Sequence, residues 1–196
     1  PVYLAEQHVQ EWTSKAIVRY FRRRRYAVRD WHLTQDLEKR VPTDWIFVDG
    51  VRMKIFGLQY KAVYANGRDH WLLDREQHGT LQRFPWIYYA ASEMRTPADR
   101  RRALRLLRVY SPDIHYRARL TVRSRVVRYL RWPMFFRAFA ACLAGHRAAS
   151  RSEFLSLLGA IADTGPRREV QQMTEYFFVD FDRRRVLRAR RRLTAR

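Results

Sequence analysis

Cysteine is nearly missing from this chain, with Cys142 as the single one among 196 residues. One cysteine excludes a disulfide framework and a cysteine-based zinc site within one chain. We therefore expect a protein of a reducing compartment, the cytoplasm. The first residues do not have the pattern of a signal peptide, which agrees with that expectation.

Long apolar runs are missing as well. The longest run, 134–145, is interrupted by Arg137 and is shorter than the roughly 20 residues that span a bilayer. We expect no membrane partner. Hydrophobic residues still make up 47% of the chain, enough for a core in one domain, or in one domain with a small appendage.

Acidic residues are scarce, with 19 against 40 basic ones, so the formal charge is +21. A field this positive favours a polyanionic partner, and nucleic acid is the first candidate. Lysine is rare among the basic residues and occurs only at Lys15, Lys39, Lys54 and Lys61. Because lysine is a compact charge that can release a proton, unlike arginine, each of these positions is of interest.

The first half of the chain, 1–95, predicts alternating helices and strands. Apolar residues at three- and four-residue spacing predict a helix over 5–25, and a second helix is expected over 71–84. Asp49-Gly50 predicts a hairpin. Strands are expected over 26–33, 44–49, 52–64 and 86–91. The predicted order is helix, three strands, helix, strand.

The second half, 96–196, predicts a mainly helical, arginine-rich extension that packs on the first half or extends it. Strands are expected over 114–122 and 176–181. Helices are expected over 97–108, 134–147 and 152–162. The chain from 183 onward is low in complexity and rich in arginine.

An acid, an amide and an amine are placed to meet on the predicted hairpin. Gln59 and Lys61 stand two residues apart on one strand, so they point to the same face. Asp44 opens the preceding strand, and the hairpin can bring it near that face. Long apolar flanks predict a central strand, where Lys61 requires a partner, and Asp44 is the expected one. An ion pair in an inactive protein would leave the same sequence pattern.

Pro42-Thr43-Asp44 and Gln59-Tyr60-Lys61 resemble the two half-motifs of the PD-(D/E)xK nuclease superfamily, with Gln59 standing 15 positions after Asp44. The resemblance covers residues about 5–91. Glutamine in place of the second acid resembles the Mrr-like branch and the nuclease subunit of some transposases. The resemblance implies an α/β, restriction-endonuclease-like core with a mixed sheet flanked by helices.

The resemblance also implies catalytic roles for the motif. Asp44, Gln59 and the backbone carbonyl of Tyr60 would hold Mg²⁺ or Mn²⁺. Lys61 would orient the attacking water, help to deprotonate it, or neutralise charge on the phosphorus. These roles make the expected protein a metal-dependent endonuclease.

A further acid on the first helix often completes sites of this superfamily. The spacing to Tyr26 places that position near Ser14, where no acid stands. Glu11, one turn earlier, is our candidate. Glu6 is the alternative, since it lies closer to the apolar stripe of the helix.

Arginine clusters are expected to contact phosphates, as arginines at every second or third position suit the nucleic-acid backbone. They include Arg22, Arg23, Arg24 and Arg25 at the end of the first helix, and Arg123 and Arg125 further on. Solvated charge is the plain alternative. No element has a recognisable base-reading code.

Four other polar and aromatic residues are further candidates. Gln77 and His78, on the second predicted helix, are either site residues or solvated ones. Trp31 and Trp132, each beside an arginine, are candidates for base stacking.

The expected function is Mg²⁺-dependent hydrolysis of nucleic acid, DNA rather than RNA, in phage defence or a mobile element. The expected assembly is a homodimer or a subunit of a larger complex. The alternative is a nuclease fold without activity that binds nucleic acid as such a subunit.

Overall fold

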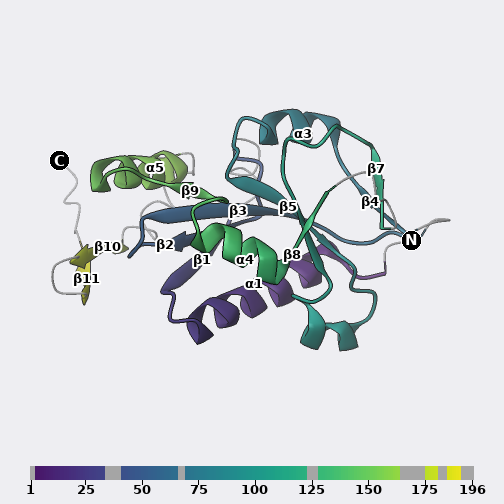
Figure 1. The fold of residues 1–196 in the computed structure, drawn as a ribbon, viewed down its shortest axis with the longest axis horizontal. Coiled ribbons are helices and arrows are strands. Elements are labelled where there is room, and N and C mark those ends of the chain that lie inside the picture. Colours follow the sequence, from purple (N-terminus) through teal and green to yellow (C-terminus); the bar gives the residue numbers. More distant parts are fainter. Residues whose placement is uncertain are drawn as a thin grey trace.

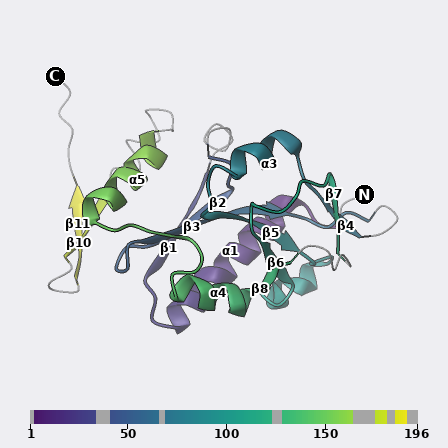
Figure 2. The same cartoon turned by 45° about the horizontal axis from the view of Figure 1, so that its top comes forward.

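The computed structural model describes residues 3–33, 41–65, 69–122, 128–163, 175–180 and 185–190, with side chains described as far as 159. Its architecture is α/β, a mixed sheet flanked by helices, as predicted (Figure 1). Helices lie on both faces of the sheet, and a rotated view shows the same arrangement (Figure 2).

The main sheet has the strand order β1-β2-β3-β5-β6-β8, and β9 pairs with the start of β3. Strands β3 and β5 are parallel, and the other neighbours on this path are antiparallel. The strands are β1 (Val28–His32), β2 (Trp45–Asp49), β3 (Lys54–Lys61), β5 (Ile87–Ser92), β6 (Leu107–Tyr110), β8 (Leu130–Arg131) and β9 (His146–Arg147). Helix α3 lies in the connection between the two parallel strands, as such connections require.

The hairpin predicted from Asp49-Gly50 is confirmed as β2–β3, with Trp45 opposite Leu58 and Asp49 opposite Lys54. The Asp49 carboxylate accepts hydrogen bonds from the N–H and the guanidinium of Arg52 inside the turn. Seven of the eight residues of β3 are buried, so its apolar flanks do mark a central strand.

Helices α1 (Glu6–Arg23) and α4 (Trp132–Ala140) cover one face with an aromatic core. Phe21 of α1 packs edge to face against Phe139 of α4, and both rings lie within 6 Å of Phe56 on β3. Edge-to-face aromatic pairs add to the stability gained from burial itself. This packing fixes α1 along the sheet, with its first turn near the end of β3.

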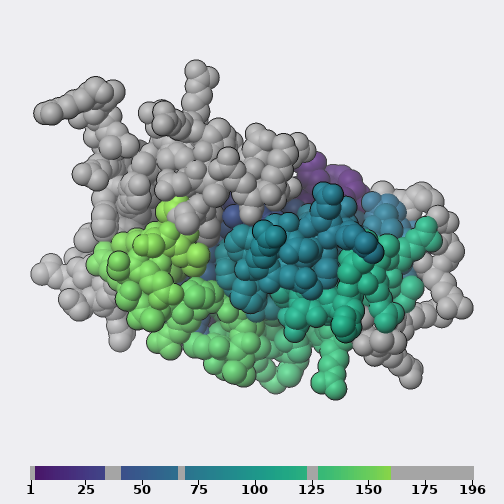
Figure 3. Space-filling view, turned by 90° about the horizontal axis from the view of Figure 1, so that it is seen from above, coloured from purple at the N-terminus to yellow at the C-terminus, as the bar shows by residue number. Residues whose placement is uncertain are grey.

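The opposite face carries α3 (Arg75–Leu81) and α5 (Arg151–Asp163), which cover a second apolar cluster (Figure 3). Ile55 and Ile87 of the sheet, Leu81 of α3 and Phe154 of α5 belong to this cluster. Alternate residues of β3 therefore serve two cores, the even-numbered ones under α1 and the odd-numbered ones under α3.

The helix predicted over 71–84 is wrong in its first part. Residues 70–72 form β4 (His70–Leu72), which pairs with β7 (Arg119–Thr121), and α3 begins only at Arg75. The Asp74 carboxylate accepts a hydrogen bond from the Gln77 N–H at 2.7 Å, which starts the helix there. Trp71 and Leu73 are buried while Leu72 is exposed, a strand alternation that the apolar letters alone conceal.

The helix predicted over 97–108 is also wrong. Only the 3-10 helix η1 (Pro97–Arg102) forms, started by a capping box between Thr96 and Asp99, and β6 follows. Strands β6 and β8 both join the main sheet, so the extension is less helical than predicted and continues the sheet across the boundary expected at residue 95.

The remaining elements agree with expectation in kind and differ in their ends. Helix α4 is shorter than predicted and begins earlier, with Pro133 in its first turn, while α5 is confirmed. The strand expected over 114–122 is confirmed only as β7, and the late strand as β10 (Glu175–Asp180), which pairs with β11 (Arg185–Arg190). Within the described residues, no helix is both long enough and apolar enough to cross a membrane.

Candidate metal and phosphate site at the end of β3

The segment before β2 places Asp44 beside β3. The Asp44 N–H donates to the Leu58 carbonyl, and the Asp44 carbonyl accepts from the Leu33 N–H. Thr43 lies directly over Gly57, where an added Cβ would stand 2.9 Å from Thr43 Oγ1. A side chain at residue 57 would therefore push this segment, and Asp44 with it, away from the strand.

Asp44 and Gln59 meet on the face of the sheet that lies under α3, and each is only 2% exposed. Gln59 Nε2 donates to Asp44 Oδ1 at 2.8 Å, and the Tyr60 N–H donates to Asp44 Oδ2 at 2.6 Å. These donors orient the carboxylate. Gln59 Oε1 is buried and has no hydrogen-bond partner. A buried carbonyl oxygen without a donor, beside a carboxylate, is a candidate ligand for a cation.

Lys61 is the last residue of β3 and shares the face of Gln59. Its side chain is 13% exposed, and the carboxylate that stands 4.0 Å from its Nζ is that of Glu6. Glu6 also accepts a hydrogen bond from the Ala62 N–H at 3.1 Å, which ties the first turn of α1 to the end of β3. Glu6 thus supplies the ion pair that we had expected from Asp44.

Glu11, the candidate for the helix acid, is not at this site. It is exposed and forms an ion pair with Lys15 one turn along the helix, at 2.5 Å. Ser14 faces the sheet instead, and its hydroxyl is 2.7 Å from that of Tyr60. Burial raises the pKa of the Tyr60 phenol well above its usual value, so this contact stays neutral. Glu6, the alternative acid, is the one that the fold brings to Lys61.

The end of β3 is also where its parallel neighbour β5 ends, with Lys61 opposite Ala91. In open α/β sheets, ligands bind in the crevice outside the carboxyl ends of parallel strands. Lys61 and Glu6 stand at this edge, and Asp44 and Gln59 lie just inside it. The polar residues are therefore at the end of the sheet where α/β proteins commonly bind their ligands.

The donor set suits a hard cation. Carboxylate and amide oxygens are the ligands of Mg²⁺, which commonly takes one or two carboxylates and leaves its other positions to water and phosphate. The partnerless Gln59 Oε1 fits that use. Among the described residues, no group of three or more His, Cys, Asp and Glu side chains is arranged to hold a metal. A cation here would thus depend on substrate oxygens. The ligand role of the Tyr60 carbonyl stays a prediction.

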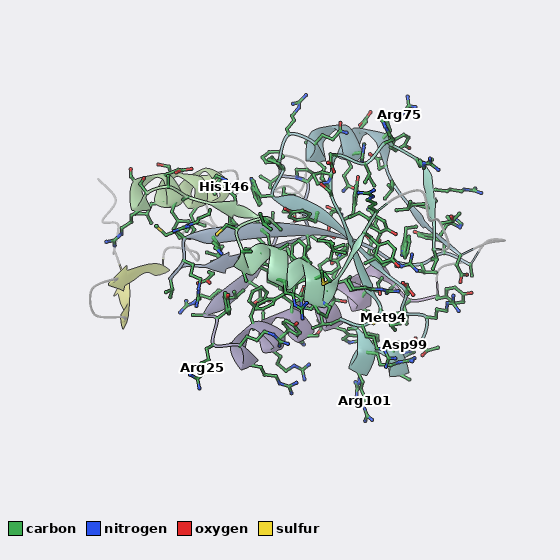
Figure 4. All side chains as sticks on the ribbon, in the orientation of Figure 1. Arg25, Arg75, Met94, Asp99, Arg101 and His146 are labelled. Atoms are coloured by element: carbon green, nitrogen blue, oxygen red, sulfur yellow. The ribbon has the colours of Figure 1, made fainter. Side chains whose placement is uncertain are left out.

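The arginines at the end of α1 lie far from the site. Arg22, Arg23, Arg24 and Arg25 are exposed. A helix rises 1.5 Å per residue, so they stand about 25 Å from Glu6 along the axis. Figure 4 shows Arg25 at that far end. A nucleic acid that touches both would have to run along α1. Arg123 and Arg125 lie outside the described residues.

The other candidates are mostly structural. His78 is 3% exposed, and its Nδ1 is 3.0 Å from the hydroxyl of Tyr89, so it belongs to the core under α3. The Gln77 side-chain oxygen is buried without a partner. Trp132 is fully buried and cannot stack on a base, whereas Trp31 is half-buried.

Comparison of the chain with protein-family models, with curated proteins and with solved structures finds no match. The geometry of the site is therefore the basis for a functional assignment.

Proposed function

We propose that the protein is a metal-dependent nuclease that hydrolyses phosphodiester bonds in nucleic acid, DNA rather than RNA. The observation that carries this proposal is that two polar pairs, Asp44 with Gln59, whose amide oxygen has no partner, and Lys61 with Glu6, lie at the same end of β3. These groups offer oxygen ligands to a cation and an ammonium to a phosphate. The formal charge of +21 suits the same polyanionic substrate.

The fold supports the proposal. From α1 to β5 the chain runs helix, three antiparallel strands, helix, and a strand parallel to the third, apart from the short β4. This is the order that a restriction-endonuclease-like core requires. We propose that residues about 5–91 form such a core and that β6 and β8 extend its sheet.

Asp44, Gln59 and the Tyr60 carbonyl, with Glu6 beside them, are the groups that would hold Mg²⁺ or Mn²⁺. Such a cation, when bound, lowers the pKa of water and offsets charge on phosphate oxygens. Asp44 is held ready by donors from Gln59 and Tyr60, so little side-chain freedom is lost on binding.

Lys61 carries the second half of the chemistry. Attack of water on phosphorus adds negative charge to the non-bridging oxygens before the P–O bond to the leaving oxygen breaks. An ammonium at the sheet edge stabilises that charge or orients the water. The Glu6 carboxylate, 4.0 Å away, holds the ammonium at the edge of the sheet.

A second candidate is a nuclease fold that binds nucleic acid without cutting it, as a subunit of a larger complex. The hydrogen bonds to both Asp44 oxygens favour this candidate, because they satisfy the carboxylate without a cation. The amide at residue 59 favours it too, since it is a weaker ligand than a carboxylate.

The assembly and setting follow from the chemistry and the resemblance. Cutting both strands of a duplex takes two sites, so we propose a homodimer or a complex with another subunit. Phage defence or a mobile element is the setting that the resemblance to Mrr-like enzymes suggests.

The test is cleavage of supercoiled plasmid and of single-stranded DNA by the purified chain. We expect nicks or breaks with Mg²⁺ or Mn²⁺, none with a chelator, and none from the Asp44→Asn variant under the same conditions. Circular dichroism confirms that the variant is folded. Binding without cleavage under all these conditions would reject the nuclease and leave the second candidate.

A further inference from the structure

Three residues that the proposed chemistry does not use form a cluster beside the end of β3. The Tyr3 N–H donates to the Val63 carbonyl at 3.3 Å, which places Tyr3 two residues beyond Lys61 along the chain direction of β3. The Tyr3 hydroxyl donates to Asp69 Oδ1 at 3.2 Å, and Arg95 donates to Asp69 Oδ2. The Arg95 guanidinium carbon stands 5.4 Å from the centre of the Tyr3 ring.

The backbone on both sides of this cluster is held in place. The Arg95 N–H donates to Asp99 Oδ2 at 3.0 Å, and the Thr96 N–H donates to the same oxygen at 3.1 Å. Hydrogen bonds to the Asp99 carboxylate, the one from the Arg95 N–H contributing most, hold the pKa of Asp99 at about 2. Asp99 therefore stays ionised at any ordinary pH, and this anchor persists. The Asp69 carbonyl accepts from the Val122 N–H at 3.0 Å. Tyr3 and Arg95 thus project from fixed supports.

Both projecting groups remain open to solvent. Tyr3 is 42% exposed, and the Arg95 side chain is 48% exposed. A guanidinium has five N–H donors, and the bond to Asp69 uses one of them. An exposed ion pair adds little to folding stability, so stability does not explain the arrangement. Aromatic rings and guanidinium planes are the groups on which unpaired bases stack, and guanidinium N–H groups bind phosphate.

We propose that Tyr3 and Arg95 form a platform that receives an unpaired nucleotide of the nucleic-acid strand, next to the phosphate held at Lys61. Asp69 is a positioning residue that fixes the ring and the guanidinium against each other. The identity of the ligand rests on the proposed function. A strand with an unpaired base at this place, as in single-stranded, branched or frayed DNA, is the substrate class that the platform selects over intact duplex.

Binding of a short single-stranded oligonucleotide, measured by fluorescence anisotropy with a chelator present, tests the platform without any cleavage. We expect Tyr3→Ala and Arg95→Ala each to weaken binding by about tenfold. The matched control is Arg101→Ala, which removes the same charge from the neighbouring η1, where Arg101 points away from the molecule (Figure 4). We expect the control to change binding by less than about threefold. Tyr3→Phe keeps the ring and retains most of the affinity.

A strand-side change separates stacking from simple charge. For the wild type, we expect an oligonucleotide with one abasic position to bind several-fold more weakly than the intact oligonucleotide, for at least one position of the missing base. For Tyr3→Ala, we expect the abasic oligonucleotide to bind no more weakly than the intact one. Equal losses for Arg95→Ala and Arg101→Ala, with no effect of Tyr3→Ala, would overturn the platform even if the wild type cuts DNA. Losses confined to Tyr3 and Arg95 in a protein that never cuts would uphold the platform and reject the nuclease.

Discussion

Strand β3 begins and ends with a lysine, and the two are used differently. Lys54 at the start is 4% exposed, and its ammonium donates to the carbonyls of Phe139 and Ala140 at 2.9 and 2.8 Å. Those carbonyls are at the end of α4, where a helix leaves its acceptors unsatisfied and its dipole favours a cation. Lys54 is a helix cap that joins α4 to the sheet.

For Lys61 at the other end, the part of the chain that the structure describes shows no such set of carbonyls around the ammonium. It lies at the edge of the sheet, partly exposed, with the Glu6 carboxylate 4.0 Å away and the Asp44–Gln59 pair on the same face. A lysine surrounded by acceptors at close distance stabilises the fold. A lysine that stands 4.0 Å from a single carboxylate at the sheet edge keeps donors for a ligand. The groups around the ammonium, more than the depth of its burial, therefore decide whether a lysine of β3 has a structural or a functional role.

The largest effect is expected for Lys61→Ala. We expect cleavage to fall by about 10²–10⁴-fold, as for the loss of a group that acts in the transition state, with little change in stability. Lys15→Ala on the exposed face of α1 is the control and should cut like the wild type. Initial rates on plasmid DNA provide the measurement. Full activity in Lys61→Ala would assign Lys61 to structure, like Lys54.

The opposite outcome is expected for Lys54→Ala. Removing the ammonium leaves two carbonyls at the end of α4 without their donor and opens a cavity, which costs about 2–3 kcal/mol of unfolding free energy. Urea denaturation measures this loss, again against Lys15→Ala. Cleavage per folded molecule should stay close to that of the wild type. Loss of activity in a folded Lys54→Ala variant would show that the two lysines are not as distinct as proposed.

The same strand shows how far the sequence alone could lead. Residue spacing correctly predicted the hairpin, the central position of β3, and the meeting of Asp44 with Gln59, because strand alternation is strict. It did not predict the partner of Lys61. The position of a helix along a sheet determines which of its turns lies over the end of a strand. For α1, the packing of Phe21 and its aromatic neighbours sets that position.

The sequence predicted helices in two segments rich in apolar residues where the structure has strands. Leu72 and Leu73 fit a helical stripe, and Leu104 and Leu107 fit another, yet β4 and β6 form because partner strands are available to them. The spacing of apolar residues within one segment gives no information about a partner strand from a distant part of the sequence. The cluster of Tyr3, Asp69 and Arg95 was missed for the same reason, since its three members are far apart in the chain.

A smaller effect distinguishes the two acids of α1. Glu6→Gln removes the carboxylate next to Lys61, and we expect cleavage to fall about tenfold, with a higher requirement for Mg²⁺. Glu11→Gln breaks only an exposed ion pair and should leave cleavage unchanged. Titration of the rate with Mg²⁺ for both variants measures the difference. A loss in Glu11→Gln, with Glu6→Gln intact, would restore Glu11 as the helix acid.

The smallest expected effect comes from Gln59→Glu, which sharpens the contrast between the two ends of β3 by adding a carboxylate at one of them. Without a cation, a second buried carboxylate beside Asp44 repels the first, and we expect the unfolding free energy to fall by about 1 kcal/mol. With Mg²⁺ the sign reverses, because a ligand that binds the folded state stabilises it in proportion to its affinity. Thermal melts in chelator and in rising Mg²⁺ therefore cross for this variant, whereas K⁺ at equal ionic strength has no such effect. A melting temperature that falls and does not recover with Mg²⁺ or Mn²⁺ would mean that no cation enters between Asp44 and residue 59. Lys61 would then stand beside a closed hydrogen-bond network, as Lys54 does at the start of the same strand.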